Sequence, residues 1–204
     1  MGLYSDRVLP HLLNLAMGSK ALAAYRRRLV PSAAGRVLEV GIGSGLNLPF
    51  YGLGVRELIG LDPSAPLLRM AGSRVTQGGL AVTMLEGSAE AIPLEAASVD
   101  TVLTTWTLCS IHDPGAALAE MRRVLKPAGV LLFVEHGRAP DLGVAQWQDR
   151  ITPLWKPIAG GCHLNRPVGT LIRQAGFGIP ELHAGYMPGP RPFTFMYEGR
   201  ATRA

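Results

Sequence analysis

The stretch Val37-Leu38-Glu39-Val40-Gly41-Ile42-Gly43-Ser44-Gly45 decides the fold class of this 204-residue chain. An apolar run typical of a buried strand leads directly into three glycines at alternate positions. Because glycine has no Cβ, the backbone can turn sharply there and a ligand can approach it closely. In a doubly wound sheet, such a turn lies at the carboxyl end of the first strand, where ligands bind.

The glycine spacing excludes two common nucleotide motifs. The dinucleotide fingerprint needs a third glycine at position 46, where Leu46 stands, and no Gly-Lys-Ser/Thr of a P-loop follows. A tight turn without a ligand remains the alternative for the glycines alone. Asp62 favours a ligand, because it ends the second apolar run, 21 positions after Gly41, and a carboxylate there can accept hydrogen bonds from two ribose hydroxyls. The alternative for Asp62 is a residue that merely precedes a helix.

Short apolar runs alternate with helical patterns on both sides of this turn. We expect strands at residues 36–40, 58–61, 80–85, 99–106 and 130–134, then two closing strands near 182–186 and 193–198. We expect two helices in the first thirty residues, separated by Gly18, and further helices at 65–75, 115–125, 142–155 and 167–175. Residues 126–129 read as a turn. The alternation predicts an α/β fold whose sheet is covered on both faces.

The charge of the chain is unevenly distributed along its length. With 20 basic and 15 acidic residues, the net charge is +5. Residues 1–36 carry +5, residues 37–137 carry −4 and residues 138–204 carry +4. The 48% hydrophobic content excludes a disordered chain and fits one domain. The basic flanks, rather than the whole chain, are therefore where an anionic partner would bind.

The two cysteines limit the kinds of site that the chain can carry. Cys109 and Cys162 are too few for a disulfide-rich secreted scaffold or a four-cysteine zinc site, and no metal site is predicted. No leader pattern opens the chain, and the longest strongly apolar run, 130–134, is too short to cross a bilayer. We therefore expect a cytoplasmic protein without a transmembrane segment.

Several motifs, in order and spacing, resemble the class I S-adenosylmethionine-dependent methyltransferases over about residues 36–136. They are the strand and turn 37–45, Gly60-Leu61-Asp62-Pro63-Ser64, Gly87-Ser88-Ala89-Glu90 with Ile92-Pro93, Ser98-Val99-Asp100, and Leu125-Lys126-Pro127-Ala128-Gly129. The resemblance implies a single Rossmann-like domain with a mostly parallel seven-stranded sheet, an antiparallel last strand and one bound S-adenosyl-L-methionine. We assign residues 1–35 to N-terminal cap helices and residues 36–204 to the methyltransferase domain.

The resemblance also places twelve residues around the cofactor. Beside its methionine part it places Glu39, Gly41, Gly43, Gly45, Thr105 and Trp106. Beside its ribose and adenine it places Asp62, Pro63, Ser64, Ser88, Ala89 and Glu90. Related enzymes often carry Asp where Ser88 stands, and a hydroxyl bonds the exocyclic amine more weakly. The acidic middle of the chain suits the sulfonium cation of this cofactor, although an arbitrary spread of surface charge would look the same.

A narrower resemblance covers nearly the whole chain and concerns the methyl acceptor. Four stretches are similar to the methyltransferase-like family that includes membrane-associated alkyl thiol methyltransferases. They are Leu9-Pro10, Leu46-Asn47-Leu48-Pro49-Phe50-Tyr51, Glu135-His136-Gly137 and Gly161-Cys162-His163-Leu164-Asn165-Arg166. Those proteins carry an apolar anchor ahead of the point where this chain begins, so membrane insertion is not carried over. Quinone-ring C-methyltransferases and phospholipid N-methyltransferases share the core motifs but match the C-terminal part less well.

The expected reaction is methyl transfer to a small, lipophilic acceptor, with a thiol favoured. A thiol needs little activation, because its pKa near 8.5 leaves a few per cent of thiolate at neutral pH. The candidate catalytic residues are His136, His163, Arg166 and Cys162, since an arginine beside a thiol can hold an anion or lower a thiol pKa. Each has a purely structural alternative: a core or surface histidine, or a loop packed on the core.

Two other classes of function remain as alternatives. One is a regulatory protein that binds S-adenosylmethionine without turnover. The other, a nucleic-acid methyltransferase, is disfavoured because Thr105-Trp106-Thr107-Leu108 stands where DNA-base enzymes carry Asn/Asp-Pro-Pro-Tyr, and because no aromatic and basic strip is present. Peripheral membrane contact through Arg26, Arg27 and Arg28 is an alternative to a solvated helix end. The oligomeric state is unknown.

Overall fold

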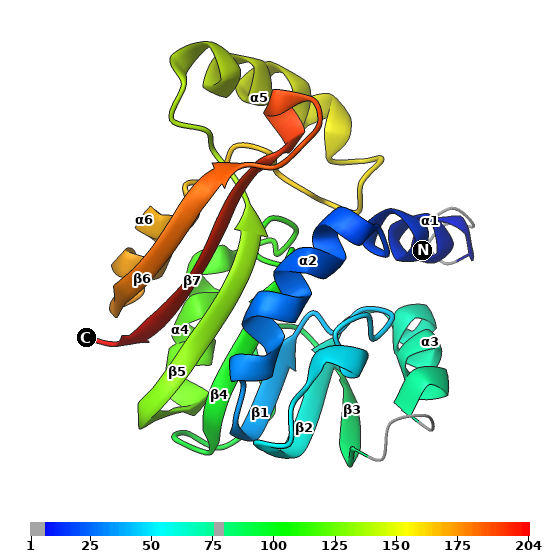
Figure 1. The fold of residues 1–204 in the computed structure, drawn as a ribbon, viewed down its shortest axis with the longest axis vertical. Coiled ribbons are helices and arrows are strands. Elements are labelled where there is room, and N and C mark those ends of the chain that lie inside the picture. Colours follow the sequence, from blue (N-terminus) through cyan, green and yellow to red (C-terminus); the bar gives the residue numbers. More distant parts are fainter. Residues whose placement is uncertain (1–6, 76–79) are drawn as a thin grey trace.

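The computed structural model describes residues 7–75 and 80–204, which form one seven-stranded sheet with helices around it (Figure 1). The strand order is β3-β2-β1-β4-β5-β7-β6. The strands are β1 (Gly35–Val40), β2 (Val55–Asp62), β3 (Val82–Glu86), β4 (Val99–Thr105), β5 (Leu125–His136), β6 (Phe177–Tyr186) and β7 (Phe195–Arg203). The first five are parallel, and β7 runs antiparallel to both of its neighbours. The predicted fold class, including the antiparallel last strand, is confirmed.

The central strands are buried on both faces, which explains their continuous apolar runs. Val37, Leu38 and Val40 of β1 are almost fully buried, as are Val102 and Leu103 of β4. The chain goes from β1 outward to β2 and β3, then returns to place β4 on the other side of β1. This reversal leaves the turn after β1 at the topological switch point, where α/β sheets bind ligands.

Residues 126–129 form part of β5 rather than the predicted turn. Val99 pairs with Leu125 and Thr101 pairs with Val130, so one residue of β4 lies opposite four residues of β5. This mismatch is a β-bulge, which keeps the strand continuous while taking up the extra residues. The turn residues Pro127 and Gly129 therefore mark a bulge, and β5 begins five residues earlier than predicted.

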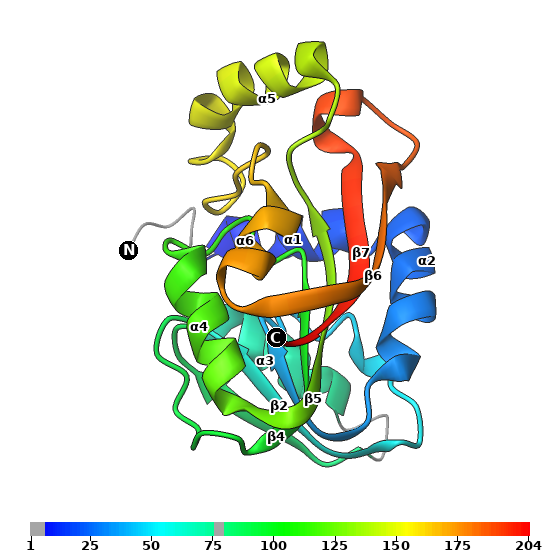
Figure 2. The ribbon, with the colours of Figure 1, turned by 90° about the vertical axis from the view of Figure 1, so that its left-hand side faces the viewer.

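Helices cover both faces of the sheet. They are α1 (Leu9–Met17), α2 (Lys20–Leu29), α3 (Ala65–Val75), α4 (Pro114–Val124), α5 (Leu142–Trp155) and α6 (Val168–Gln174). Helix α2 lies on one face, whereas α4 and α6 lie on the other (Figure 2). Helix α5 stands beyond the carboxyl ends of the parallel strands, near the short helix η4 (Arg191–Phe193) (Figure 1). Within residues 7–75 and 80–204, every helix is too short or too polar to span a bilayer.

The end of α2 is more buried than the run of three arginines suggests. Arg26 is 4% exposed and donates hydrogen bonds to the carbonyl of Met17 and to Asn47 Oδ1. The interpretation of all three arginines as a solvated helix end is therefore wrong for Arg26. Its spacing from the buried Leu22 and Leu29 places it on the inward face of α2.

Arg28 joins α2 to β7 through a surface ion pair with Glu198. Its guanidinium forms two hydrogen bonds with the carboxylate, at 3.2 and 2.6 Å. Because the Arg28 side chain is 54% exposed, water screens the pair, and we expect a coupling free energy below about 1 kcal/mol. A double-mutant cycle of Arg28→Ala and Glu198→Ala, followed by urea denaturation, measures it. A coupling of several kcal/mol would contradict this expectation.

Candidate functional site

A cavity of about 1020 Å³ lies at the carboxyl ends of the parallel strands. Its walls include the residues that end all five parallel strands, namely Val40, Asp62, Glu86, Thr105 and His136. Helix α1 contributes further lining residues, and so does the loop that follows α5. The volume lies at the upper end of the range for small-molecule sites, so the cavity has room for two ligands side by side.

The three glycines of the turn after β1 have left-handed backbones but differ in what surrounds them. The φ angles of Gly41, Gly43 and Gly45 are +75°, +56° and +79°. A Cβ on Gly41 would overlap the Thr107 side chain, and one on Gly45 would meet Leu48 at 2.7 Å. On Gly43, the nearest atom to such a Cβ would be 3.9 Å away. Gly43 therefore presents open backbone to a ligand, whereas Gly41 and Gly45 allow close packing inside the protein.

Asp62 ties the end of β2 to this turn. Its Oδ2 accepts the N–H of Gly43 at 2.9 Å, and its Oδ1 accepts the N–H of Ser64 at 2.8 Å. Burial raises the pKa of this carboxyl above its ordinary value, and the two backbone donors partly offset that rise. Each carboxylate oxygen retains a lone pair, so Asp62 can still accept hydrogen bonds from a ligand in the cavity.

Glu39 lies at the base of the cavity in a buried polar network. Its Oε1 accepts from Asn47 Nδ2 at 2.8 Å and its Oε2 accepts from the Tyr51 hydroxyl at 2.6 Å. Asn47 Nδ2 also donates to Thr105 Oγ1 at 3.0 Å. Arg26 completes the network through Asn47. The side chain that the resemblance places behind the glycines is thus held directly by Asn47 and Tyr51, and Asn47 is held in turn by Thr105 and Arg26.

Burial raises the pKa of Glu39 from 4.5 to about 7, against hydrogen bonds from Tyr51 and Asn47 that lower it. Between these two pH values the folded protein holds a proton that the unfolded chain has lost, so stability falls as pH rises. This loss of unfolding free energy between pH 4.5 and 7 amounts to about 3 kcal/mol, and we expect it to be absent in Glu39→Gln. Urea denaturation of both proteins from about pH 4.5 to 7.5 measures it. Parallel stability curves for wild type and variant would contradict the assignment.

At the far side of the cavity, Ser88 and Glu90 form a small polar cluster. Ser88 Oγ lies 3.0 Å from Glu90 Oε2, and Glu90 Oε1 accepts the N–H of Asp113 at 2.6 Å. These contacts hold the pKa of the Glu90 carboxyl below its ordinary value, the bond from Asp113 most of all. Ala89 beside them is buried and lines the cavity. The apolar Ala89 side chain therefore lies beside the polar oxygens of Ser88 and Glu90 in the cavity wall.

Eleven of the twelve predicted cofactor residues line this one cavity; Gly45 does not. Those that line it are Glu39, Gly41, Gly43, Asp62, Pro63, Ser64, Ser88, Ala89, Glu90, Thr105 and Trp106. Gly45 lies instead against Leu48 and Ala71. Of the predicted catalytic residues, His136 and Cys162 line the cavity, and His163 and Arg166 do not. The roles assigned to all of these residues remain predictions.

His136 and Cys162 meet at one end of the cavity, together with Cys109. His136 Nε2 lies 2.9 Å from Cys162 Sγ, and the ligand atoms of all three side chains lie within 4.8 Å of one another. Cys109 follows β4, His136 ends β5 and Cys162 belongs to the loop after α5. Hydrogen bonding from Cys162, aided by the His136 imidazole, holds the pKa of the Cys109 thiol well below its ordinary value.

Arg166 and His163 brace the loop beneath this cluster. Arg166 is 8% exposed and donates to the carbonyls of Leu108 and Ile111. The N–H of His163 donates to the carbonyl of Cys109 at 2.8 Å. The Arg166 guanidinium and the His163 backbone therefore join the segment after β4 to the segment that carries Cys162.

Several residues at the site could not be singled out from the sequence. Cys109, Asn47 and Tyr51 have no motif that assigns them a role, although Asn47 and Tyr51 belong to a stretch that carries the narrower resemblance. Glu135 is also buried, and its Oε1 accepts from Thr104 Oγ1 and from the N–H groups of Thr107 and Leu108. Glu135 follows an apolar run in the sequence, and a buried acidic residue in a strand indicates a hydrogen-bonded or functional role.

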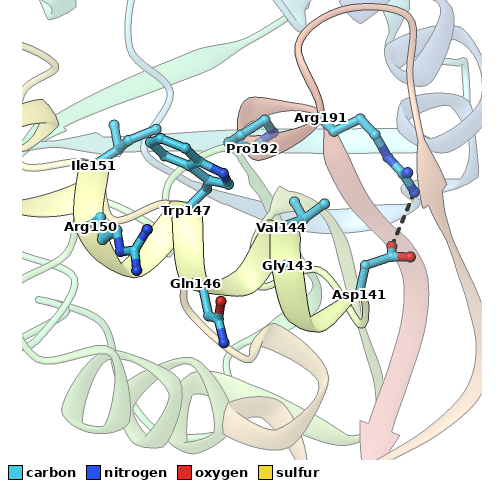
Figure 3. Close-up of a pocket in the computed structure, with 9 residues that line it drawn as sticks. All are labelled: Asp141, Gly143, Val144, Gln146, Trp147, Arg150, Ile151, Arg191 and Pro192. Atoms are coloured by element: carbon cyan, nitrogen blue, oxygen red, sulfur yellow. Dashed lines mark hydrogen bonds and ion pairs between the residues drawn. The ribbon is translucent and has the colours of Figure 1, made fainter.

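A second hollow, of about 620 Å³, lies on α5 away from the strand ends (Figure 3). An ion pair between Arg191 and Asp141, 3.2 Å long, closes one end of it, and Trp147 lies on the helix nearby (Figure 3). Its nine lining residues include none of the predicted site residues. The cavity at the strand ends is therefore the candidate active site.

The lining of the large cavity fits an adenosine-type cofactor with a cationic centre. Gly43 presents open backbone, Asp62 offers buried carboxylate oxygens, and Glu39 supplies a second acidic group deeper in. Hydroxyl groups and a cation are the ligands that such acceptors favour. The residues present therefore fit S-adenosylmethionine, which carries ribose hydroxyls and a sulfonium.

Comparison with known proteins supports the same conclusion. Residues 38–133 match the methyltransferase domain family. Human thiol S-methyltransferase TMT1B is 34% identical over 196 residues, which cover 92% of this chain and 78% of the human protein. The rat thiol S-methyltransferase TMT1B is 34% identical over 160 residues, which cover 76% of this chain and 64% of the rat protein.

A similar fold is known from crystal structures. A SAM-dependent methyltransferase from Thermotoga maritima superposes with a TM-score of 0.68 at 24% identity, covering 95% of this chain and 94% of that one. At this level of identity the likeness shows the fold. The methyltransferase domain match and the human relative assign the activity, S-adenosylmethionine-dependent methyl transfer, and the cofactor, S-adenosyl-L-methionine. The chain belongs to the class I S-adenosylmethionine-dependent methyltransferases, in the family that includes the thiol S-methyltransferases.

Proposed function

We propose that the protein methylates the sulfur of a small, lipophilic thiol. The observation that carries the proposal is the single cavity that joins Asp62 and Gly43 to the cluster of Cys109, His136 and Cys162. One end has hydrogen-bond acceptors for a cofactor, and the other has an imidazole and two thiols that can bind or deprotonate an acceptor thiol. The similarity to thiol S-methyltransferases over 78% of the human protein supports the same acceptor class.

At the cofactor end, we propose the twelve roles that the resemblance assigns, with Gly45 acting through packing rather than contact. Asp62 accepts hydrogen bonds from the ribose hydroxyls, and the Gly43 backbone faces the methionine part. S-adenosylmethionine supplies an electrophilic methyl group on its sulfonium. Above its pKa of about 7, the Glu39 carboxyl adds a negative charge to the cavity wall that favours that cation.

At the acceptor end, the residues align the nucleophile and exclude water. Methyl transfer is an in-line displacement: the acceptor sulfur forms a bond to the methyl carbon as the bond from that carbon to the sulfonium breaks. Trp106 and Trp155 line the cavity there and make it apolar. Without a bound metal, His136 stands where an imidazole can accept the proton of an incoming thiol, because its Nε2 already faces a thiol sulfur.

The N-terminal helices form the outer wall of the cavity. Leu9, Leu13, Asn14 and Met17 of α1 and Arg26 of α2 line it. We propose that residues 1–35 act as a cap that shapes the acceptor entrance, and that residues 36–204 form the catalytic domain. The apolar side chains on α1 favour a lipophilic acceptor over a charged one.

A methylation screen tests the proposal. The purified protein is incubated with S-adenosylmethionine and a panel of alkyl thiols, aryl thiols, quinols and lipid amines. We expect S-adenosylhomocysteine together with S-methylated product from the lipophilic thiols, both quantified by mass spectrometry. Asp62→Asn is the inactive control.

Two outcomes would overturn the proposed acceptor. Methylation of a quinol carbon or a lipid amine, with the thiols untouched, would assign the protein to a different acceptor class. S-adenosylhomocysteine binding without turnover on any acceptor would favour a regulatory role.

A further inference from the structure

We propose that Cys109, His136 and Cys162 form a zinc site with one open position facing the cavity. Counting cysteines alone predicts no metal site, but a histidine from another strand completes a three-ligand set. Two thiolates and an imidazole are the donors that Zn²⁺ prefers, and three protein ligands with a free fourth position are typical of catalytic zinc. The site stands on these three side chains, whereas its use in thiol chemistry rests on the proposed function.

The spacing of the three ligand atoms fits one ion. Cys109 Sγ, His136 Nε2 and Cys162 Sγ lie within 4.8 Å of one another. Around a tetrahedral zinc, two sulfurs stand about 3.8 Å apart, and a sulfur and a nitrogen about 3.6 Å apart. His136 Nε2 and Cys162 Sγ are now 2.9 Å apart, so binding has to lengthen this contact by about 0.7 Å. A rotation of either side chain supplies such a movement.

The loop that carries Cys162 is built to hold it beside Cys109. Gly160 and Gly161 have left-handed backbones, with φ angles of +61° and +86°, which turn the chain inward after α5. The N–H of His163 then donates to the carbonyl of Cys109 at 2.8 Å. The residue after Cys162 is thus bonded to the backbone of Cys109, which lies 53 positions before Cys162 in the sequence.

An unpaired donor lies beside the sulfurs. In the described part of the chain, Trp155 Nε1 is buried without a hydrogen bond of ordinary geometry, and Trp155 packs against the apolar cluster of Cys109 and Cys162, with the Cys162 thiol as its neighbouring acceptor. The Ser110 hydroxyl lies 3.5 Å from Cys109 Sγ. Metal-bound thiolates are acceptors, so both groups can donate to them and stabilise the charged ligands.

The open position explains how a thiol acceptor would be activated. All three ligands line the cavity, so an acceptor sulfur can occupy the fourth position. A thiol that binds there becomes a thiolate and releases its proton to solvent, because His136 Nε2 is then a zinc ligand and no longer accepts it. Its sulfur then forms the bond to the methyl carbon while the sulfonium bond breaks, leaving a neutral thioether. A thioether is a weaker zinc ligand than a thiolate, so the product leaves.

Metal analysis of the purified protein tests the site. The chain is produced with added zinc, kept reduced with a phosphine, checked by mass spectrometry for free thiols and analysed by plasma mass spectrometry. We expect about one zinc per chain in the wild type. Because loss of an outer-shell group alone costs 10- to 100-fold in metal affinity, loss of a ligand in Cys109→Ser, Cys162→Ser or His136→Gln should cost at least about 100-fold.

His183→Gln is the matched control, since His183 is exposed on β6 and lies outside the cavity. Binding of S-adenosylhomocysteine shows whether each variant is folded. Cobalt replaces zinc for spectroscopy, and we expect thiolate-to-cobalt charge-transfer bands that grow when a lipophilic thiol is added. The bands should be absent in Cys162→Ser.

The outcomes separate this inference from the proposed function. A reduced wild type that binds no zinc, or ligand variants that bind it as well as the wild type, would overturn the site. If such metal-free protein still methylates thiols, the proposed function stands without it. If zinc binds through the three residues and the cobalt bands respond to thiols, the site is supported, even where no methylated product forms and the proposed function fails.

Discussion

We expect Asp62→Asn to weaken S-adenosylhomocysteine binding by at least about 100-fold, because two charge-assisted hydrogen bonds to a ligand are worth about 3 kcal/mol together. The substitution acts twice. It removes the negative charge that would face the ribose, and it turns an amide N–H₂ toward the N–H of either Gly43 or Ser64. The turn that presents Gly43 to the cofactor thereby loses one of its anchors. Isothermal titration with S-adenosylhomocysteine measures the effect.

Asp149→Asn is the matched control for this prediction. Asp149 is a surface residue of α5 that pairs with Arg138 at 2.7 Å and lies outside the cavity lining. We expect its affinity for S-adenosylhomocysteine to match that of the wild type. An Asp62→Asn protein that is folded and binds within a few-fold of the wild type would show that Asp62 only supports the turn.

We expect Gly41→Ala to destabilise the protein by about 4 kcal/mol, and Gly43→Ala to do so by only about 1 kcal/mol. Both glycines have left-handed backbones, so both variants carry the conformational cost of an L-residue there. At Gly41 the added methyl also overlaps Thr107, whereas at Gly43 it enters open space beside the cavity. Urea denaturation of the two variants measures the difference.

Ligand binding should separate the same two variants in the opposite direction. Gly43→Ala remains folded, but its methyl occupies space that faces the cofactor, so we expect at least about tenfold weaker S-adenosylhomocysteine binding. Thr107→Ala, combined with Gly41→Ala, removes the two nearest overlapping atoms and should recover part of the lost stability. Equal stability of Gly41→Ala and Gly43→Ala would contradict the packing argument.

The buried network around Glu39 gives the site a charge that the composition had only suggested. The sequence shows an acidic middle, residues 37–137, between basic flanks. In the structure four of those acids, Glu39, Asp62, Glu86 and Glu90, line the cavity, and the first two are buried. Arg26 from the basic flank turns inward to Asn47. The charge at the site is therefore set by a few buried groups from both parts of the chain, rather than by the average of either.

Local patterns were sufficient for the architecture. Apolar runs and helical spacing predicted the existence of the seven strands and six α-helices of the described residues, because backbone hydrogen bonding and burial leave periodic patterns along a chain. The two closing strands were misplaced: β6 begins at residue 177 rather than near 182, and β7 covers 195–203 rather than 193–198. The antiparallel direction of the last strand came from the family resemblance. The glycine turn and Asp62 predicted a ligand at the switch point, and the structure brings both into one cavity. Two further errors were the bulge at residues 126–129 and the inward-facing Arg26. Each depends on a neighbour that lies far away in the sequence.

The acceptor end of the cavity depends on contacts that no local pattern encodes. Cys109 follows β4, His136 ends β5 and Cys162 follows α5. Nothing in their spacing along the chain predicts that their ligand atoms lie close together. The same holds for the difference between Gly41 and Gly43, which Thr107 alone creates. Backbone preferences act between neighbouring residues, so the amino-acid sequence alone was enough to predict the sheet, the switch point and the cofactor turn. Chemistry at an active site depends on distances between side chains, and these are set only when the β4, β5 and α5 segments pack together.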